Sequence, residues 1–229
     1  MEQITVKIID TRKWNKPQSR LDLVFERDKN RKKSQQKVDE RIHYMWFNYL
    51  QLCLDLERIN YGVPKRGGRG KIISTTKVKV SKDIYRKWDL EKVKKSSFSE
   101  WYNDGEHRLL FYEGGFKYSR GSQYHSLVKR FNVFILYHNM MNDKNFYLKG
   151  GESKGMMVSE KIVEEIEKLG GQKERYELLD RKDYDAVEKV KGGTKKKNVR
   201  ELSNQKRVLK DVVGCENTIL AICEGRFPK

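Results

Sequence analysis

The sequence predicts a mainly α-helical protein with a small N-terminal β element. Two long stretches carry apolar residues at helical spacing, and capping residues mark where shorter helices begin and end. A β-branched stretch near the N-terminus alternates as a strand does. These elements divide the chain into an N-terminal β/basic segment (1–36), a first helical unit with a helix-turn-helix-like region (37–118), a second, similar helical unit (119–170), and a basic linker with a C-terminal helix (171–229).

The N-terminal β element is predicted at residues 2–9, EQITVKII, which could pair with residues 21–25, LDLVF. Residues 26–37 are almost wholly polar and strongly basic. They are either a basic connection or the start of the helix that follows.

The first long helix is the clearest element of the sequence. Its apolar residues keep the helical period for about six turns. They are Val38, Ile42, Met45, Tyr49, Leu52, Cys53, Leu56 and Ile59. Trp46, Leu50 and Leu54 widen this stripe, so the helix is expected to be buried on much of its circumference. Gly62 and Pro64 end it.

Residues 65–71, KRGGRGK, are expected to form a glycine-arginine loop. Glycines let a backbone approach a phosphate closely, and Lys65, Arg66 and Arg69 would hold that phosphate by charge. The spacing is not that of a Walker motif. An exposed loop without a ligand explains the same residues. Residues 72–80 are β-branched and are expected to be a strand or an extended lead-in.

Residues 78–114 are the stretch around which we expect the chain to be organised. Ser81 is a candidate N-cap of a short helix, and Asp89 of a second. Three apolar residues follow the first cap at helical spacing: Ile84, Tyr85 and Trp88. A third short helix is predicted by the capping box of Ser97 and Glu100, with Phe98 and Trp101 on one face and a stop signal at residues 103–105.

Two or three short helices with one basic surface are the outline of a helix-turn-helix DNA reader. The alternative is a short helical hairpin whose lysines are only solvated. A second long helix is predicted from Ser122 to Asn142, and it is followed, like the first, by a loop and a Val-Ser pair. Ser81 and Ser159 would then begin equivalent short helices of a duplicated unit, with chance similarity as the alternative. The second of these helices carries Glu160 and Glu164, so only the first could face phosphate.

Residues 189–197, KVKGGTKKK, are predicted to be a mobile basic arm or a linker. The last helix is predicted at residues 203–224. Its apolar positions are Leu209, Val212, Val213, Ile219, Leu220 and Cys223.

Charge is the outstanding property of the chain. Its 229 residues include 50 Lys and Arg against 32 Asp and Glu, which gives a net charge of +18. Such an excess of positive charge repels itself, so its usual role is to bind a polyanionic partner or a membrane surface. No apolar run approaches the ~20 residues that a membrane span needs. We therefore expect no membrane and a nucleic-acid partner, DNA rather than RNA.

Sparse cysteines without metal spacing (Cys53, Cys215 and Cys223) indicate core thiols in a reducing, cytoplasmic setting. A metal-dependent nuclease would need clustered carboxylates. The densest acidic group lacks the strand setting of such a site: Asp180, Asp183, Asp185 and Glu188. An enzyme is therefore less expected than a binding protein, and no cofactor or metal is expected.

The sequence thus predicts an intracellular, site-specific DNA-binding protein that acts as a transcriptional repressor or regulator. Its Lys-, Asn- and Ile-rich composition suits a phage or mobile element, and a homodimer would pair two half-sites. The predicted DNA contacts are Lys82, Arg86, Lys87, Lys92, Lys94 and Lys95, with phosphate clamps at Lys65, Arg66, Arg69, Lys195, Lys196 and Lys197. Two other classes stay open: a metal-dependent nuclease or a remnant of one, and a basic protein that binds an acidic protein.

Overall fold

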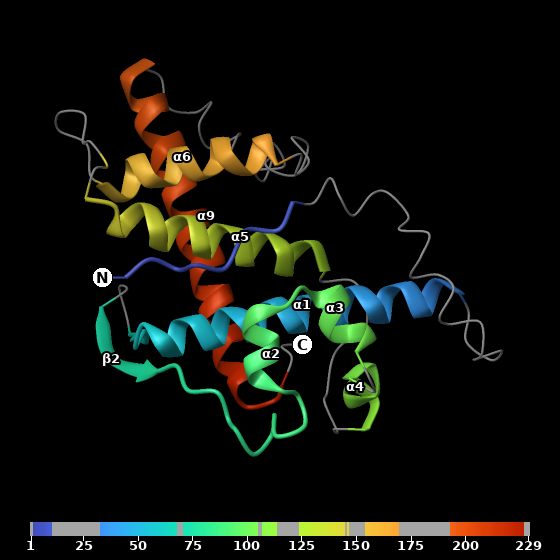
Figure 1. Cartoon of the computed structure of the whole chain (residues 1–229). Coiled ribbons are helices and arrows are strands. Elements are labelled where there is room, and N and C mark those ends of the chain that lie inside the picture. Colours follow the sequence, from blue (N-terminus) through green and yellow to red (C-terminus); the bar gives the residue numbers. More distant parts are fainter. Residues whose placement is uncertain are drawn as a thin grey trace. The chain divides into compact units, whose positions relative to one another are not determined.

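The computed structural model describes residues 2–10, 33–67, 71–104, 107–113, 124–144, 146, 154–169 and 193–226. Within these residues the protein is mostly helical with one small antiparallel sheet, as the sequence predicts (Figure 1). The elements are α1 (Lys33–Arg58), β1 (Gly62–Arg66), β2 (Ile72–Lys77), α2 (Leu90–Lys95), α3 (Phe98–Asn103), the 3₁₀ turn η4 (His107–Leu109), α4 (Leu110–Glu113), α5 (Tyr124–Asn142), α6 (Lys154–Lys168) and α9 (Gly193–Cys223).

The chain forms two compact units. The first holds Met1–Val6, Val24–Val128 and Gly214–Lys229, and the second holds Lys7–Leu23 and Lys129–Val213. Two of the boundaries between the units fall inside α5 and α9. All the basic residues from β1 to α2 therefore belong to the first unit.

Helix α1 is the centre of the first unit. Met45, Trp46, Tyr49 and Leu50 have no exposed surface. Because neighbouring residues of a helix point about 100° apart, burial of these adjacent pairs means that α1 is covered on most sides, as predicted. The three cysteines are also buried, as predicted for core thiols.

The strand expected within residues 72–80 is confirmed as β2, whereas the strand predicted at residues 2–9 is not formed. Residues 2–10 are not assigned to a strand, because their backbone bonds to side chains. The Thr5 N–H donates to the Asp55 carboxylate at 2.6 Å, and the side-chain amide of Asn132 bonds both the N–H and the C=O of Ile9 at 2.8 Å. The sheet is instead the hairpin of β1 and β2, and residues 21–25 lie outside the described residues.

Residues 82–87 form turns, and the helix predicted to begin at Ser81 is not present. The Tyr85 N–H donates to the Ser81 carbonyl at 3.1 Å, and the Trp88 N–H donates to the Tyr85 carbonyl at 2.9 Å. These bonds close single turns. The backbone of Asp89 is left-handed, with φ of 46°, which keeps the turns from continuing into α2.

The predicted caps of the next two helices are confirmed. At the start of α2 the Asp89 carboxylate accepts the Lys92 N–H at 3.2 Å. At the start of α3 the Ser97 hydroxyl accepts the Glu100 N–H at 3.3 Å, and the Glu100 carboxylate accepts the Ser97 N–H at 2.8 Å. That backbone hydrogen bond lowers the pKa of the Glu100 carboxyl. Helix α3 ends at Asn103, where the stop signal was predicted.

In the second unit, α5, α6 and α9 each bury an apolar face. The buried residues include Phe131 and Phe134 on α5, Val158, Ile162 and Ile166 on α6, and Val208 and Val212 on α9. Lys129 of α5 forms an ion pair of 2.8 Å with Asp211 of α9. Helix α9 begins at Gly193, earlier than the predicted residue 203. Residues 195–202, KKKNVREL, are mostly strong helix formers, so the helix extends through the run that was predicted to be mobile.

The two segments that the sequence pairs as copies have different conformations. Ser81 precedes a set of turns, whereas Ser159 lies buried inside α6 and donates its hydroxyl to the Gly155 carbonyl at 2.7 Å. Ser159 is therefore not an N-cap, and the prediction that it begins a short helix is wrong.

Candidate nucleic-acid interface

The cations predicted to contact DNA lie mainly on residues 78–95, which we call the basic segment. The segment has seven cations against three carboxylates. Its exposed cations are Lys79, Lys82, Arg86, Lys87, Lys94 and Lys95. Five of the apolar side chains between them are at most 4% exposed: Val78, Val80, Tyr85, Trp88 and Val93. Ile84, by contrast, is 42% exposed. Buried side chains therefore anchor the segment, and the cations are left outside.

Hydrogen bonds to α1 and to the end of α9 fix the first half of the basic segment. The Ser81 N–H donates to the Cys223 carbonyl at 3.1 Å. The Tyr85 hydroxyl donates to the Ile222 carbonyl at 2.6 Å and accepts the indole N–H of Trp46 at 3.0 Å. Burial raises the pKa of Tyr85, so its hydroxyl stays protonated as a donor.

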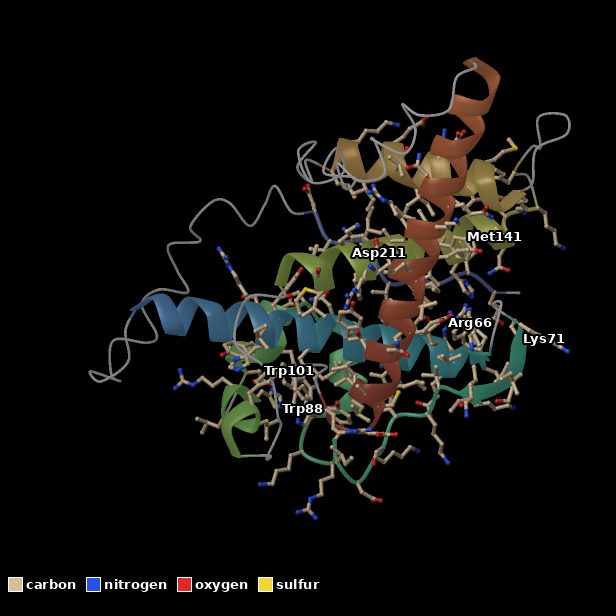
Figure 2. The ribbon with its side chains drawn as sticks, turned by 180° about the vertical axis from the view of Figure 1, so that it is seen from behind. Arg66, Lys71, Trp88, Trp101, Met141 and Asp211 are labelled. Carbon is tan, nitrogen blue, oxygen red and sulfur yellow. The ribbon has the colours of Figure 1, made fainter. Side chains whose placement is uncertain are left out.

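Helices α3 and α1 fix the second half. Trp101 donates its indole N–H to the Trp88 carbonyl at 2.8 Å, and the two rings stack with centroids 5.0 Å apart (Figure 2). The side-chain amide of Gln51 donates to the carbonyls of Val93 and Ser96, at 2.7 and 3.0 Å, and so holds the end of α2. The backbone under the cations is thus bonded to the core along its length.

The cations of the basic segment differ in whether a neighbouring carboxylate already compensates their charge. Lys94 lies 2.7 Å from the Glu91 carboxylate, and Lys92 pairs with Asp104. The hydrogen bonds from these lysines lower the pKa of both carboxyls. By contrast, the four remaining predicted contacts of this segment form no ion pair with another described residue: they are Lys82, Arg86, Lys87 and Lys95. Their charge is the most available to a phosphate.

The predicted helical face of this segment is not formed. Lys82 and Arg86 lie on turns, so their separation by four residues does not place them on one side of a helix. Helix α3 has no cation, and it buries Phe98, Trp101 and Tyr102 in the core. The candidate contacts are therefore those of the turns and of α2.

The glycine-arginine loop connects β1 to β2. Lys65 is exposed on β1, but the guanidinium of Arg66 pairs with Glu216 of α9, whose side chain is only 3% exposed. Arg66 Nη2 lies 3.3 Å from Oε1 of Glu216, and the Tyr61 hydroxyl donates to the same oxygen at 3.2 Å. Burial, together with the Glu216 charge, raises the pKa of Tyr61. The charge of Arg66 is thus compensated within the first unit, and Arg69 lies outside the described residues.

The remaining predicted clamp belongs to the second unit. Lys195, Lys196 and Lys197 lie in the first turns of α9, whereas the basic segment and the hairpin belong to the first unit. The acidic group at residues 180–188 lies outside the described residues.

Three exposed cations in residues 71–79 were not among the predicted contacts: Lys71, Lys77 and Lys79. Lys79 lies between the buried Val78 and Val80. The alternation of apolar and charged residues in the sequence could have indicated that Lys79 is exposed. Lys71 is the last residue of the glycine-arginine loop, and its carbonyl accepts the Gly67 N–H at 2.8 Å. No local signal could have indicated Glu216, because 150 residues separate it from Arg66.

In the part of the chain that the structure describes, no group of three or more His, Cys, Asp or Glu residues could hold a metal ion. None of the described helices has both the length and the apolar character needed to cross a membrane. Comparisons with protein-family models, curated proteins and solved structures give no match for this chain.

Proposed function

We propose that the protein binds DNA through the basic segment and acts by occupying its site, as a transcriptional repressor or regulator does. One observation carries the proposal: Lys82, Arg86 and Lys87 are exposed cations on a backbone held by the buried Tyr85 and Trp88. Cations that replace condensed counterions on DNA gain affinity from the counterions released. A backbone that is already ordered loses little conformational entropy on binding.

The first test is the salt dependence of binding to a labelled duplex. Each neutralised phosphate contributes a slope of about −0.9 to the plot of log K against log salt concentration. We expect at least ~4 effective contacts, hence a slope of about −3.6 or steeper. A binding constant that does not change from low to physiological salt would remove the nucleic-acid proposal.

The second test locates the contacts. Lys82→Ala combined with Arg86→Ala should weaken binding at least tenfold, or ~1.4 kcal/mol, and should reduce the steepness of the salt plot by about 1.8. The matched control is Lys161→Ala with Lys206→Ala, which removes the same charge from exposed lysines of the second unit. Equal losses in the two double variants would mean that net charge binds the DNA, without a specific surface.

The acidic positions of α6 provide a control of opposite sign. Neutralising Glu160 and Glu164 to glutamine should leave DNA binding unchanged or slightly tighter, because these carboxylates repel phosphate. Circular dichroism and melting must first show that all variants are folded. An essential glutamate pair with a dispensable Lys82 and Arg86 would place the binding surface elsewhere.

Site specificity is tested by sequencing the nucleic acid that copurifies after crosslinking. A recurrent duplex DNA site would support the proposal of a site-specific regulator. Recurrent RNA would mean that the partner is RNA and not DNA. One stoichiometric acidic protein without nucleic acid would favour the protein-binding alternative. Metal-dependent cleavage that Asp180→Ala abolishes would favour the nuclease.

A further inference from the structure

The β1–β2 hairpin exposes an entire strand. All six residues of β2 are exposed, and Ile72 and Ile73 are exposed by 58% and 67%. Large β-branched side chains are ordinarily buried. Two adjacent isoleucines in solvent therefore form an apolar patch that a partner could cover.

A β-bulge distinguishes the position of these isoleucines. Lys65 pairs with Ser74 and Arg66 with Ile72, so Ile73 is an extra residue with no partner position on β1. Bulges bend a strand and redirect side chains, and they are over-represented at sheet edges and next to active sites. The side chain of Ile73 lies over Gly67, where a Cβ would come within 2.9 Å of Cγ1 of Ile73. Gly67 thus gives Ile73 the space it occupies.

The charge around the isoleucines identifies the class of partner. Residues 62–77 contain five Lys or Arg and no Asp or Glu. Of these cations Lys65, Lys71 and Lys77 are exposed. A surface with two apolar side chains among exposed cations complements a polyanion that also has apolar groups, and a DNA duplex offers base edges and sugars inside its grooves.

The hairpin is held at its base, beside Tyr61 and Val78, and at its loop end, through Arg66, whereas the side chains of β2 are exposed. The Arg66 guanidinium and the Tyr61 hydroxyl both bond to Glu216, and the Val78 N–H donates to the Tyr61 carbonyl at 3.0 Å. The hairpin lies beside the C-terminal end of α1, while α2 and α3 lie nearer the middle of that helix (Figure 1). Arg66 and Lys71 are correspondingly apart from Trp88 and Trp101 in the opposite view (Figure 2). The loop end of the hairpin is therefore apart from the part of the basic segment that Trp88 anchors, while Lys79 lies two residues after the end of β2.

We propose that this hairpin is a second DNA contact, which places Ile72 and Ile73 in a groove as an apolar wedge and bends the duplex. The proposal rests on DNA binding by the basic segment. Proteins that insert apolar side chains between base steps unstack those steps and kink the duplex. A β-ribbon with cations beside its apolar side chains can reach the bases while its charges contact the phosphates.

The test uses the full-length protein and a short duplex labelled at both ends, with 2-aminopurine at successive positions. Wild-type protein should raise energy transfer between the ends, because the duplex bends, and should raise 2-aminopurine fluorescence at one step, because that base unstacks. Ile72→Thr with Ile73→Thr keeps the β-branched shape and the charge. This double variant should lose both signals and bind three- to tenfold more weakly, with an unchanged salt slope because no cation is removed. Thr76→Ser, on the same strand, is the control for altering an exposed β2 side chain.

The outcomes separate this inference from the proposed function. If wild-type protein fails to bind duplex DNA, both are overturned. If it binds with a slope that depends on Lys82 and Arg86, but without distortion, the hairpin inference alone is overturned. The inference also fails if the isoleucine variant bends DNA as the wild type does. A change of oligomeric state in sedimentation, without loss of DNA distortion, would show that Ile72 and Ile73 join two copies of the chain instead.

Discussion

Replacing Arg66 with methionine tests whether this residue holds the fold or contacts phosphate. The Glu216 carboxylate is 3% exposed, and in the variant it would keep the Tyr61 hydrogen bond but lose the guanidinium. Removing one partner of a buried ion pair typically costs about 3–5 kcal/mol. The Arg66 side chain is itself 30% exposed, so water reaches part of the vacated space. We therefore expect a loss of about 2–3 kcal/mol in the free energy of unfolding.

Urea unfolding followed by tryptophan fluorescence measures this loss. Trp46, Trp88 and Trp101 are buried in the first unit, which also contains Arg66 and Glu216. With a urea m-value of about 2 kcal/mol per molar, the midpoint should fall by about 1–1.5 M. The double variant Arg66→Met, Glu216→Gln should recover most of the loss, because no charge is then buried without a partner.

Lys65→Met is the matched control, because Lys65 is the exposed neighbour of Arg66 on β1. Its effect on stability should stay within about 0.5 kcal/mol. In DNA binding the variant with the larger effect should be Lys65→Met. It should reduce the salt slope by about 0.9 if Lys65 contacts a phosphate, whereas Arg66→Met should leave the slope unchanged. Equal stability of the two single variants, together with a reduced slope for Arg66→Met, would refute the structural role given to Arg66 and restore it as a phosphate clamp.

Three further outcomes are expected. Met45→Ala and Phe131→Ala remove side chains with no exposed surface, so each should lower the free energy of unfolding by about 2–5 kcal/mol. Unchanged melting temperatures would mean that these helix faces are not part of the core. Ser97→Ala removes the N-cap of α3 and should cost about 1 kcal/mol in urea unfolding, and no measurable loss would contradict the cap. Burial lowers the pKa of His138. Below pH ~6.5 the native state therefore binds fewer protons than the unfolded state. The free energy of unfolding should have its full value above that pH and should fall below it by up to about 1.4 kcal/mol per pH unit. His138→Gln should flatten that part of the stability profile, and a variant profile with the wild-type slope would contradict the assignment.

Elements that depend on near neighbours could be predicted from the sequence. The periodicity of α1 and α5, the caps at Asp89 and Ser97, and the end of α3 at Asn103 all agree with the structure. Helical periodicity and side-chain caps involve residues within about four positions of one another, so the sequence states them directly. The net charge also follows directly from the sequence, and the prediction of a polyanionic partner rests on that charge.

The path of residues 78–88 depended on contacts that no local pattern shows. Tyr85 and Trp88 have a spacing compatible with a helix, but the Tyr85 hydroxyl bonds to the Ile222 carbonyl, 137 residues away. Arg66 similarly meets Glu216 across 150 residues. The sequence alone thus determined which residues are charged and where the two long helices α1 and α5 lie. Only the tertiary structure decided which cations are held by buried carboxylates and which remain available, because that choice is made where distant segments pack together.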